Sequence, residues 1–275
     1  MKHLITTLII FISISNILAQ DKHDFSIEFN VNGSYHNMER ANNYIAEDPA
    51  YKYMSVSPEK GYLNTLNLGL DYTLGISYQP FNFMDFGVFV NYQSSRFNRT
   101  SSSQYYVDPV SYPDSTNTQY GNIRNETNAF SFGISSTLYI NKLLHFDRFN
   151  TIFLKKIIIS TGIKGGIGFS SFNEQSGFEN SISDYTNFQY MATNFNGRAE
   201  LGVAYPICNH SFFSSIGVKI GYQLFKTSPL KNHAGVHLYP NDDPFSNDDY
   251  LDPDKKVSLD FSGVYYGVYL RIGKH

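Results

Sequence analysis

Residues 62–78 read YLNTLNLGLDYTLGISY, and their side chains alternate in character along the whole segment. Every second residue from Tyr62 to Tyr78 is apolar or aromatic except Asn64, whereas the residues between them are small or polar apart from Leu63. A strict period of two predicts one extended strand with an apolar face and a polar face. Strands of soluble domains usually have about 5–6 residues. The length of this segment is instead typical of a strand that crosses a bilayer, which needs about 9–11 tilted residues.

The apolar face of this segment has the height of a bilayer. Its aliphatic part runs from Leu66 to Ile76, which is ten steps along the strand. At about 3.3 Å per residue and a tilt near 40°, that row stands roughly 25 Å tall, which matches the apolar band of membrane barrels. Tyr78 lies just beyond the row, where aromatic residues flank such a band. The segment therefore predicts a transmembrane β-strand with one face toward lipid.

Seven further segments show the same alternation, so the sequence predicts eight strands in total. The connections between them alternate in length, which is typical of barrels with short periplasmic turns and long extracellular loops. Because a bilayer tolerates no unpaired sheet edge, the first strand is expected to pair with the last. The predicted long loops are residues 37–60, 96–127, 173–187 and 226–256. The predicted strands are residues 25–35, 62–78, 84–93, 130–140, 157–169, 191–205, 212–224 and 263–273.

Over nearly the whole mature chain, this pattern resembles the small bacterial outer-membrane β-barrel proteins of the OmpA-barrel, OmpX and OmpW type. The composition, rich in Tyr, Asn and Phe, is similar to that of barrels from Bacteroidota. The resemblance implies an all-β fold, a closed antiparallel up-and-down transmembrane barrel of eight strands. It also implies contact with outer-membrane lipid and lipopolysaccharide, and insertion by the barrel assembly machinery.

The start of the chain predicts export. Leu4 to Ile14 is mostly apolar after a short polar start, and Ile17 and Ala19 form an acceptable cleavage site before Gln20. We therefore expect residues 1–19 to be a Sec-type signal peptide and residues 20–275 to be the barrel domain, located in the bacterial outer membrane. The net charge of −3 argues against nucleic acid as a partner, because proteins that bind it usually carry basic patches.

Charged residues occupy the polar face of the predicted strands. An eight-stranded barrel is filled by its own side chains, and an isolated charge inside it is costly, so these residues are expected to pair. Counting through the turn after residue 205 places Lys219 beside Arg198, with Glu200 as the counter-ion of both. Closure brings Glu28 close to Arg271, unless each of them meets water at the rim. The predicted lumen cluster, structural in role, has four acids and four bases: Glu28, Asp71, Asp85, Glu200, Lys164, Arg198, Lys219 and Arg271.

The favoured function is non-enzymatic, because four long loops suit surface contact, adhesion or a structural role in the envelope, with an extracellular ligand that the sequence does not name. A narrow solute channel of the OmpW kind is an alternative, although a filled lumen disfavours open diffusion. A rim hydrolase acting on lipid A or peptides is a further alternative, because His36, His233 and His237 fall at the predicted outer rim.

No catalytic, cofactor-binding or metal-binding residue is assigned, and no cofactor is expected. The Asp-rich residues 242–254 offer hard oxygen ligands that suit Ca²⁺. They lack the glycine and the final glutamate of an EF-hand loop, so a solvated acidic loop is the simpler interpretation.

Overall fold

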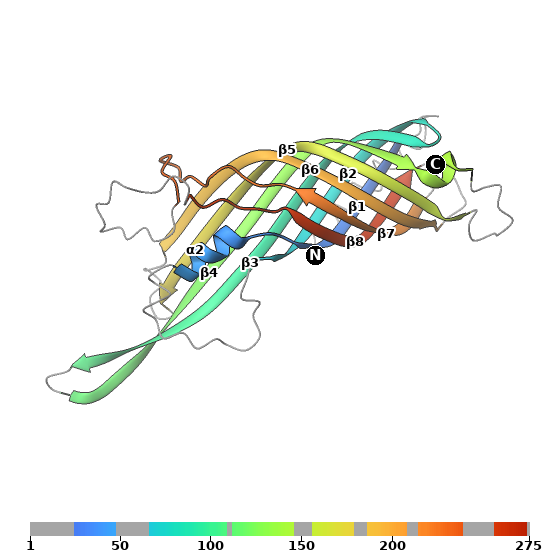
Figure 1. The fold of residues 1–275 in the computed structure, drawn as a ribbon. Coiled ribbons are helices and arrows are strands. Elements are labelled where there is room, and N and C mark those ends of the chain that lie inside the picture. Colours follow the sequence, from blue (N-terminus) through green and yellow to red (C-terminus); the bar gives the residue numbers. More distant parts are fainter. Residues whose placement is uncertain are drawn as a thin grey trace.

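The computed structural model describes residues 25–47, 66–108, 112–145, 156–178, 186–207, 214–238 and 256–273. Its eight strands form one closed antiparallel barrel in which each strand pairs with its neighbours in the chain (Figure 1). The sheet closes where β8 pairs with β1, from Ser26–Gly273 to Ser34–Tyr265. The predictions of eight strands and of closure are confirmed. The strands are β1 (Phe25–Tyr35), β2 (Leu68–Phe81), β3 (Met84–Asp108), β4 (Tyr112–Tyr139), β5 (Ile158–Phe178), β6 (Thr186–Pro206), β7 (Ser214–Leu224) and β8 (Gly263–Gly273).

Side chains alternate between the outside and the inside of the barrel, as the period of two predicts. On β2, Leu70 is 53% exposed whereas Asp71 and Thr73 are buried. On β7, Val218 is exposed and Lys219 is buried. The polar face of each strand therefore lines a filled interior, and the apolar face forms the outer wall.

Large apolar side chains are exposed on the outer wall all around the barrel. On β6 the exposed row runs from Phe195 to Tyr205, ten steps along the strand, or roughly 25 Å of height at the usual tilt. An apolar surface of this extent is unfavourable in water, and a bilayer removes it from water. Examples from the eight strands are Phe29, Leu74, Val90, Phe132, Ile163, Leu201, Ile220 and Val268.

The two rims of the barrel carry different connections. One rim holds the first residue of β1, the last residue of β8 and the tight turn between β2 and β3. Beyond the other rim, β3, β4, β5 and β6 continue past the barrel wall (Figure 1). Because the longer connections of such barrels lie outside the cell, we assign this second rim to the external side.

β3 and β4 are much longer than the sequence predicts. The pairing of β2 with β3 ends at Gly69–Ser95. β3 and β4 stay paired beyond that point, from Arg96–Glu126 to Asp108–Tyr112. The prediction of a loop over residues 96–127 is therefore wrong for its described part, because residues 96–108 and 112–127 belong to a projecting hairpin (Figure 1). Outside the bilayer no lipid requires an apolar face, so the alternation that marks a spanning strand is missing. Backbone pairing remains possible, and Thr and Tyr favour strands.

The predicted loop over residues 173–187 is shortened for the same reason. β5 continues to Phe178 and β6 begins at Thr186, and the two strands pair up to Ser176–Thr186. Only residues 179–185 lie between them, outside the described residues. The sheet of β3 to β6 therefore rises above the barrel on one side.

Some residues that the alternation assigns to the lipid face are not exposed on it, and Ile27 of β1 is one of them at 3% exposure. Leu66 is fully buried, because it belongs to the turn before β2 and its backbone N–H donates to Asn42 Oδ1 at 3.0 Å. Ile140 begins the short helix α4 (Ile140–Leu143) instead of ending β4. Residues 62–65 and the predicted signal peptide over residues 1–19 lie outside the described residues. No described helix is long and apolar enough to cross a membrane.

Candidate functional site

The barrel interior contains all eight charged residues of the predicted lumen cluster. Each of them has an oppositely charged side chain within 4 Å. Asp71 pairs with Arg198, and the remaining six residues form a second, connected group nearer the periplasmic rim. Four acids therefore neutralise four bases inside the wall. The structural role of the cluster stays a prediction.

Two lysines and two glutamates form the centre of the larger group. Lys219 Nζ lies 2.5 Å from Glu28 Oε1 and 3.0 Å from Glu200 Oε1. Lys164 Nζ lies 3.1 Å from Glu200 Oε2 and 3.8 Å from Glu28 Oε1. Each carboxylate therefore contacts both ammonium groups, which compensates the cost of burying all four charges.

The seam of the barrel brings Glu28 and Arg271 together as the closure argument predicts. They stand directly opposite each other on β1 and β8. Arg271 Nη1 lies 3.9 Å from Glu28 Oε2, whereas its Nη2 makes a much closer bond to Asp85 Oδ2. Arg271 also donates to the hydroxyl of Ser26 at 2.6 Å. The main counter-ion of Arg271 is therefore Asp85 on β3.

The predicted counter-ion of Arg198 is wrong. Arg198 stands opposite Gln223, and Lys219 stands opposite Gly202, so the β6–β7 register differs by four residues from the predicted one. Glu200 does bind Lys219, but Arg198 Nη2 binds Asp71 Oδ2 across the lumen at 2.5 Å. Counting through a turn gives neighbours on adjacent strands, and it cannot find a partner on the opposite wall.

Asp71 is the centre of a polar layer that closes the lumen near the external rim. Its side chain is fully buried, and its two oxygens accept five hydrogen bonds of 2.5 to 3.2 Å. A carboxylate with this many donors is well compensated for the loss of water. The donors come from four strands and are Asn32, Thr73, Asn91, Gln93 and Arg198.

Three buried tyrosines complete the lumen, and the sequence reasoning missed them. Arg198 lies 5.1 Å from the ring centre of Tyr265, and Lys219 lies 4.5 Å from that of Tyr269. These rings also lie against glycines of β7, since a Cβ atom on Gly221 would come within 2.4 Å of the Tyr265 ring. The alternation along β8 could have predicted Tyr265 and Tyr269, because both are an even number of residues from Arg271 and so lie on the same, inward face of the strand. The third, Tyr139, stacks 5.3 Å from Arg271 and donates to Asp85 at 2.6 Å.

Above the polar layer, the lumen ends in an apolar cap made of residues 36–47, 66–67, 225–238 and 256–262. Thr227 N–H donates to Leu259 O at 2.8 Å, and Leu230 N–H donates to Val257 O at 2.9 Å, so the two chain segments pair. The described part of residues 226–256 contains no helix or strand, so the predicted loop is confirmed there, and isolated bridges hold it within the cap. Helix α2 (Glu39–Glu47) adds to the cap. The buried core of the cap also includes residues of the barrel wall. It contains Met38, Ala41, Leu66, Ala129, Phe172, Ala192, Phe225, Leu230, Leu238, Val257, Leu259 and Phe261.

His36 is the first residue of the cap and lies at its junction with the barrel wall, because it contacts Ser34 of β1 and Phe261 of the cap. Its Nδ1 donates to the carbonyl of Phe261 at 3.1 Å, because a carbonyl only accepts, and its Nε2 therefore accepts the hydroxyl of Ser34 at 2.9 Å. Its ring lies edge-on to that of Phe261, 5.4 Å between centres. Burial lowers the pKa of His36 to about 4. The neutral imidazole is thus the form that joins the two regions.

The rim-hydrolase alternative finds no support in the histidines. His36 is 1% exposed and both its ring nitrogens contact the protein, whereas His233 is exposed and His237 is half-buried on the cap. His36 therefore does not share an accessible site with the other two histidines. Among the described residues no group of three or more His, Cys, Asp or Glu side chains could hold a metal ion. The Asp-rich residues 242–254 lie outside that part of the chain.

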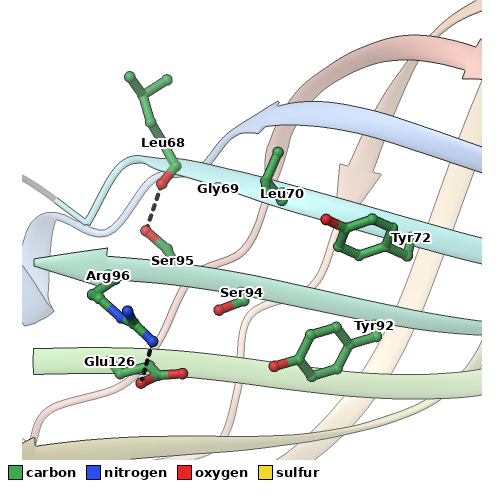
Figure 2. A pocket seen from close by; sticks show the side chains of 9 residues that line it. All are labelled: Leu68, Gly69, Leu70, Tyr72, Tyr92, Ser94, Ser95, Arg96 and Glu126. Carbon is green, nitrogen blue, oxygen red and sulfur yellow. Dashed lines mark hydrogen bonds and ion pairs between the residues drawn. The ribbon is translucent and has the colours of Figure 1, made fainter. Parts of the chain in front are cut away.

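The outer wall has a shallow groove of about 570 Å³ where β2, β3 and β4 reach the external rim (Figure 2). Leu68, Leu70 and Tyr72 line it from β2, and Tyr92 lines it from β3. Besides Gly69, two hydroxyl residues and an ion pair complete it. These are Ser94, Ser95, Arg96 and Glu126.

The ion pair at the upper end of this wall groove has a third member. Glu126 Oε2 lies 3.3 Å from Arg96 Nη2 and 2.8 Å from Arg124 Nη2. Asn128 donates to the other oxygen at 3.3 Å, and Tyr92 donates to Asn128 Oδ1 at 2.7 Å. One carboxylate therefore orients two guanidinium groups, and the site keeps one net positive charge.

The closed strand order, the apolar outer wall and the polar lumen decide the fold. The chain is a small β-barrel of the outer-membrane type. No protein-family model and no curated protein matches its sequence. The predicted Bacteroidota origin stays a prediction.

Three of the solved structures that are similar to this barrel illustrate the likeness. Neisserial surface protein A (NspA) is 10% identical, with 91% of this chain and 97% of that chain covered and a TM-score of 0.43. Ail, the attachment invasion locus protein of Yersinia pestis, in complex with a heparin analogue, is 11% identical, with 92% and 97% covered and a TM-score of 0.33. The outer membrane protein OprG from Pseudomonas aeruginosa is 10% identical, with 92% and 96% covered and a TM-score of 0.32.

Proposed function

We propose that this barrel is a non-enzymatic surface protein that contacts material outside the cell through its projecting β3–β4 hairpin. The observation that carries the proposal is the length of the two strands, which have 25 and 28 residues, when a bilayer needs only about 9–11 per strand. The additional residues form a ribbon beyond the barrel wall (Figure 1). This ribbon adds external surface without adding to the wall, which suits contact with another molecule.

The composition of the hairpin supports this proposal. Residues 97–123 are rich in Ser, Thr, Asn and Gln, with tyrosines distributed among them. Tyrosine offers a large contact area at low conformational entropy cost, and short polar residues offer adaptable hydrogen bonds. The tyrosines are Tyr105, Tyr106, Tyr112 and Tyr120.

The closed interior favours surface contact over the channel alternative. The Asp71–Arg198 pair and the Gln93–Gln223 pair join side chains of different strands across the lumen. The apolar cap lies above them. A solute would have to displace both layers, so we expect planar-bilayer recordings of the purified barrel to give no discrete openings.

The test is a shortened hairpin. Residues 101–121 are removed and Thr100 is joined to Asn122, its partner on β4, through an Asn-Gly turn that suits a two-residue hairpin. Cells that produce equal surface amounts of each chain are compared for attachment to collagen-coated plastic and to one another. Attachment should fall to that of cells without the protein, while the folded form persists in unboiled gels. Unchanged attachment by the folded, shortened chain would contradict the proposal.

A further inference from the structure

The outer part of β3 has one open edge. The pairing of β2 with β3 ends at Gly69–Ser95, and the chain before β2 turns into the cap at Leu66. From Arg96 to Asp108, β3 pairs with β4 on one side, and no strand in the described part of the chain pairs with its other side. A row of backbone N–H and C=O groups without a partner strand is a template for pairing with another extended chain.

The register of the hairpin shows which residues of β3 face this open edge. Tyr139 N–H donates to the carbonyl of Phe83, directly before β3, at 2.7 Å, and the register stays constant up to Tyr106–Thr116. Because successive residues of a strand direct their backbone groups to alternate sides, the odd-numbered residues of β3 bond to β4. The even-numbered residues from Arg96 onward therefore direct their N–H and C=O groups to the open edge.

The two strands of the hairpin differ in how well their open edges are protected. The open edge of β4 lies before Gly121, where its pairing with β5 ends, and it contains Pro113 and Asp114. Proline and charged residues are common means of protecting an edge strand from pairing. Residues 100–107 of β3 read TSSSQYYV and contain no proline, glycine or charged residue. The β3 edge is therefore the one that favours pairing.

The sequence of the β3 edge is complementary to itself in the antiparallel direction. When two copies are aligned with Ser102 opposite Ser102, Arg96 of each copy stands opposite Asp108 of the other. These residues are even-numbered, so the alignment joins backbone groups that face the open edge. Opposite charges directly across a strand pair stabilise it, and like charges destabilise it. The other facing pairs contain no like charges and are Phe97–Val107, Asn98–Tyr106, Arg99–Tyr105, Thr100–Gln104 and Ser101–Ser103.

From these observations we infer that the β3 edge binds the β3 edge of a second copy of this chain. β3 runs outward from the periplasmic rim (Figure 1), so an antiparallel partner approaches from the opposite direction. The second barrel therefore lies in a facing membrane, and the contact joins two cells. Arg96 keeps 48% of its side-chain surface exposed beside Glu126, so its guanidinium retains donors for a second carboxylate. This inference rests on the proposed function, because it names a partner of the projecting hairpin.

The test is association between phosphatidylcholine vesicles that contain the purified full chain, measured as coincidence of two fluorescent labels. Wild-type vesicles should associate, unlike vesicles without protein. Ser102→Pro removes an N–H that faces the open edge and leaves the bonds to β4 in place, so it should abolish association. The matched control is Thr118→Pro, which makes the same change on the open edge of β4, opposite Gln104. It should associate as the wild type does.

Exchanging charges tests the alignment of the two copies. Arg96→Asp and Asp108→Arg each place like charges opposite one another when identical chains pair, so vesicles of either variant alone should lose most of their association. Mixing the two kinds of vesicle brings opposite charges together at both ends of the paired edge. The mixture should therefore associate as the wild type does. Each variant is first shown to be folded by its mobility in unboiled gels.

Three results would overturn the inference. They are wild-type vesicles that stay separate, Ser102→Pro vesicles that associate like the control, and charge variants whose association is not restored by mixing. None of them contradicts the proposed function as long as the shortened hairpin loses attachment to collagen. Unchanged attachment of the shortened chain is the separate result that contradicts the proposed function.

Discussion

The barrel wall and the cap arrange apolar side chains in opposite ways. In the wall they point outward, as Val218 does at 60% exposure beside the buried Lys219. In the cap they point inward, and Leu259 and Phe261 are fully buried. The change occurs within one chain segment, because the buried Gln223 of β7 is followed two residues later by a buried phenylalanine of the cap.

The difference shows that the surrounding solvent decides which side chains lie inside. Lipid solvates apolar groups as well as a protein core does, so the lumen of the wall is held by hydrogen bonds and ion pairs. Water surrounds the cap, so the hydrophobic effect favours an apolar core there. The wall should therefore depend on charge, and the cap should depend on packed volume.

Breaking the buried ion pair of the wall should give the largest effect. Arg198→Met leaves Asp71 without its counter-ion in the lumen, which should lower the free energy of unfolding by about 3–5 kcal/mol. The measurement is guanidinium unfolding in detergent, followed by circular dichroism because the chain has no tryptophan.

The double variant Asp71→Leu with Arg198→Met is the control for this change. It removes both charges, so it should recover part of the lost stability. Equal losses in the single and the double variant would mean that packed volume, and not charge, stabilises this part of the lumen. The contrast between wall and cap would then fail.

Removing volume should affect the cap more than the wall. Leu259→Ala empties space in a fully buried core, which should cost about 2–5 kcal/mol. Leu201→Ala makes the same change on the exposed outer face of β6, where lipid fills the space and no cavity term arises. Hydrogen exchange of the cap amides detects the first loss even if the barrel stays folded. Equal losses at both positions would contradict the contrast.

The sequence predicts the wall well because lipid imposes a period of two on every spanning strand. It predicts less outside the bilayer, where residues 96–108 pair with residues 112–126 although their sequence shows no apolar alternation. Part of the cap could have been predicted, because Val257, Leu259 and Phe261 alternate with polar residues. No sequence pattern predicts the partner of Arg198, because Asp71 lies on the opposite side of the barrel. Such contacts depend on the cross-section of the closed barrel, which no local pattern contains.

Acid should weaken the junction between the barrel wall and the cap. The buried His36 has a pKa of about 4; besides burial, Arg198 lowers it, and Phe261, Asp71 and Asp260 act in the opposite direction. The unfolded chain takes up this proton near its ordinary pKa of about 6.5. Stability therefore falls as the pH falls from about 6.5 to about 4, and the full loss is about 3 kcal/mol.

The comparison that measures this loss uses His36→Gln. The free energy of unfolding of each chain is measured at pH 7 and at pH 4. The lumen carboxylates titrate in both chains, so their contribution cancels in the difference. The wild type should lose about 3 kcal/mol more than the variant on acidification, and parallel losses would show that His36 is not the group that links the regions.

The smallest effect on the free energy of unfolding should come from breaking an ion pair on the outer surface of the barrel. The side chain of Arg96 is 48% exposed beside Glu126, whereas that of Arg198 is 1% exposed beside Asp71. Water and salt screen the outer pair, so Arg96→Gln should change the free energy of unfolding by only about 0–1 kcal/mol. Guanidinium unfolding under the conditions used for Arg198→Met provides the measurement. If Arg96→Gln destabilised the barrel as strongly as Arg198→Met, the environment of a charge would not determine its contribution, and the contrast between interior and exterior would be lost.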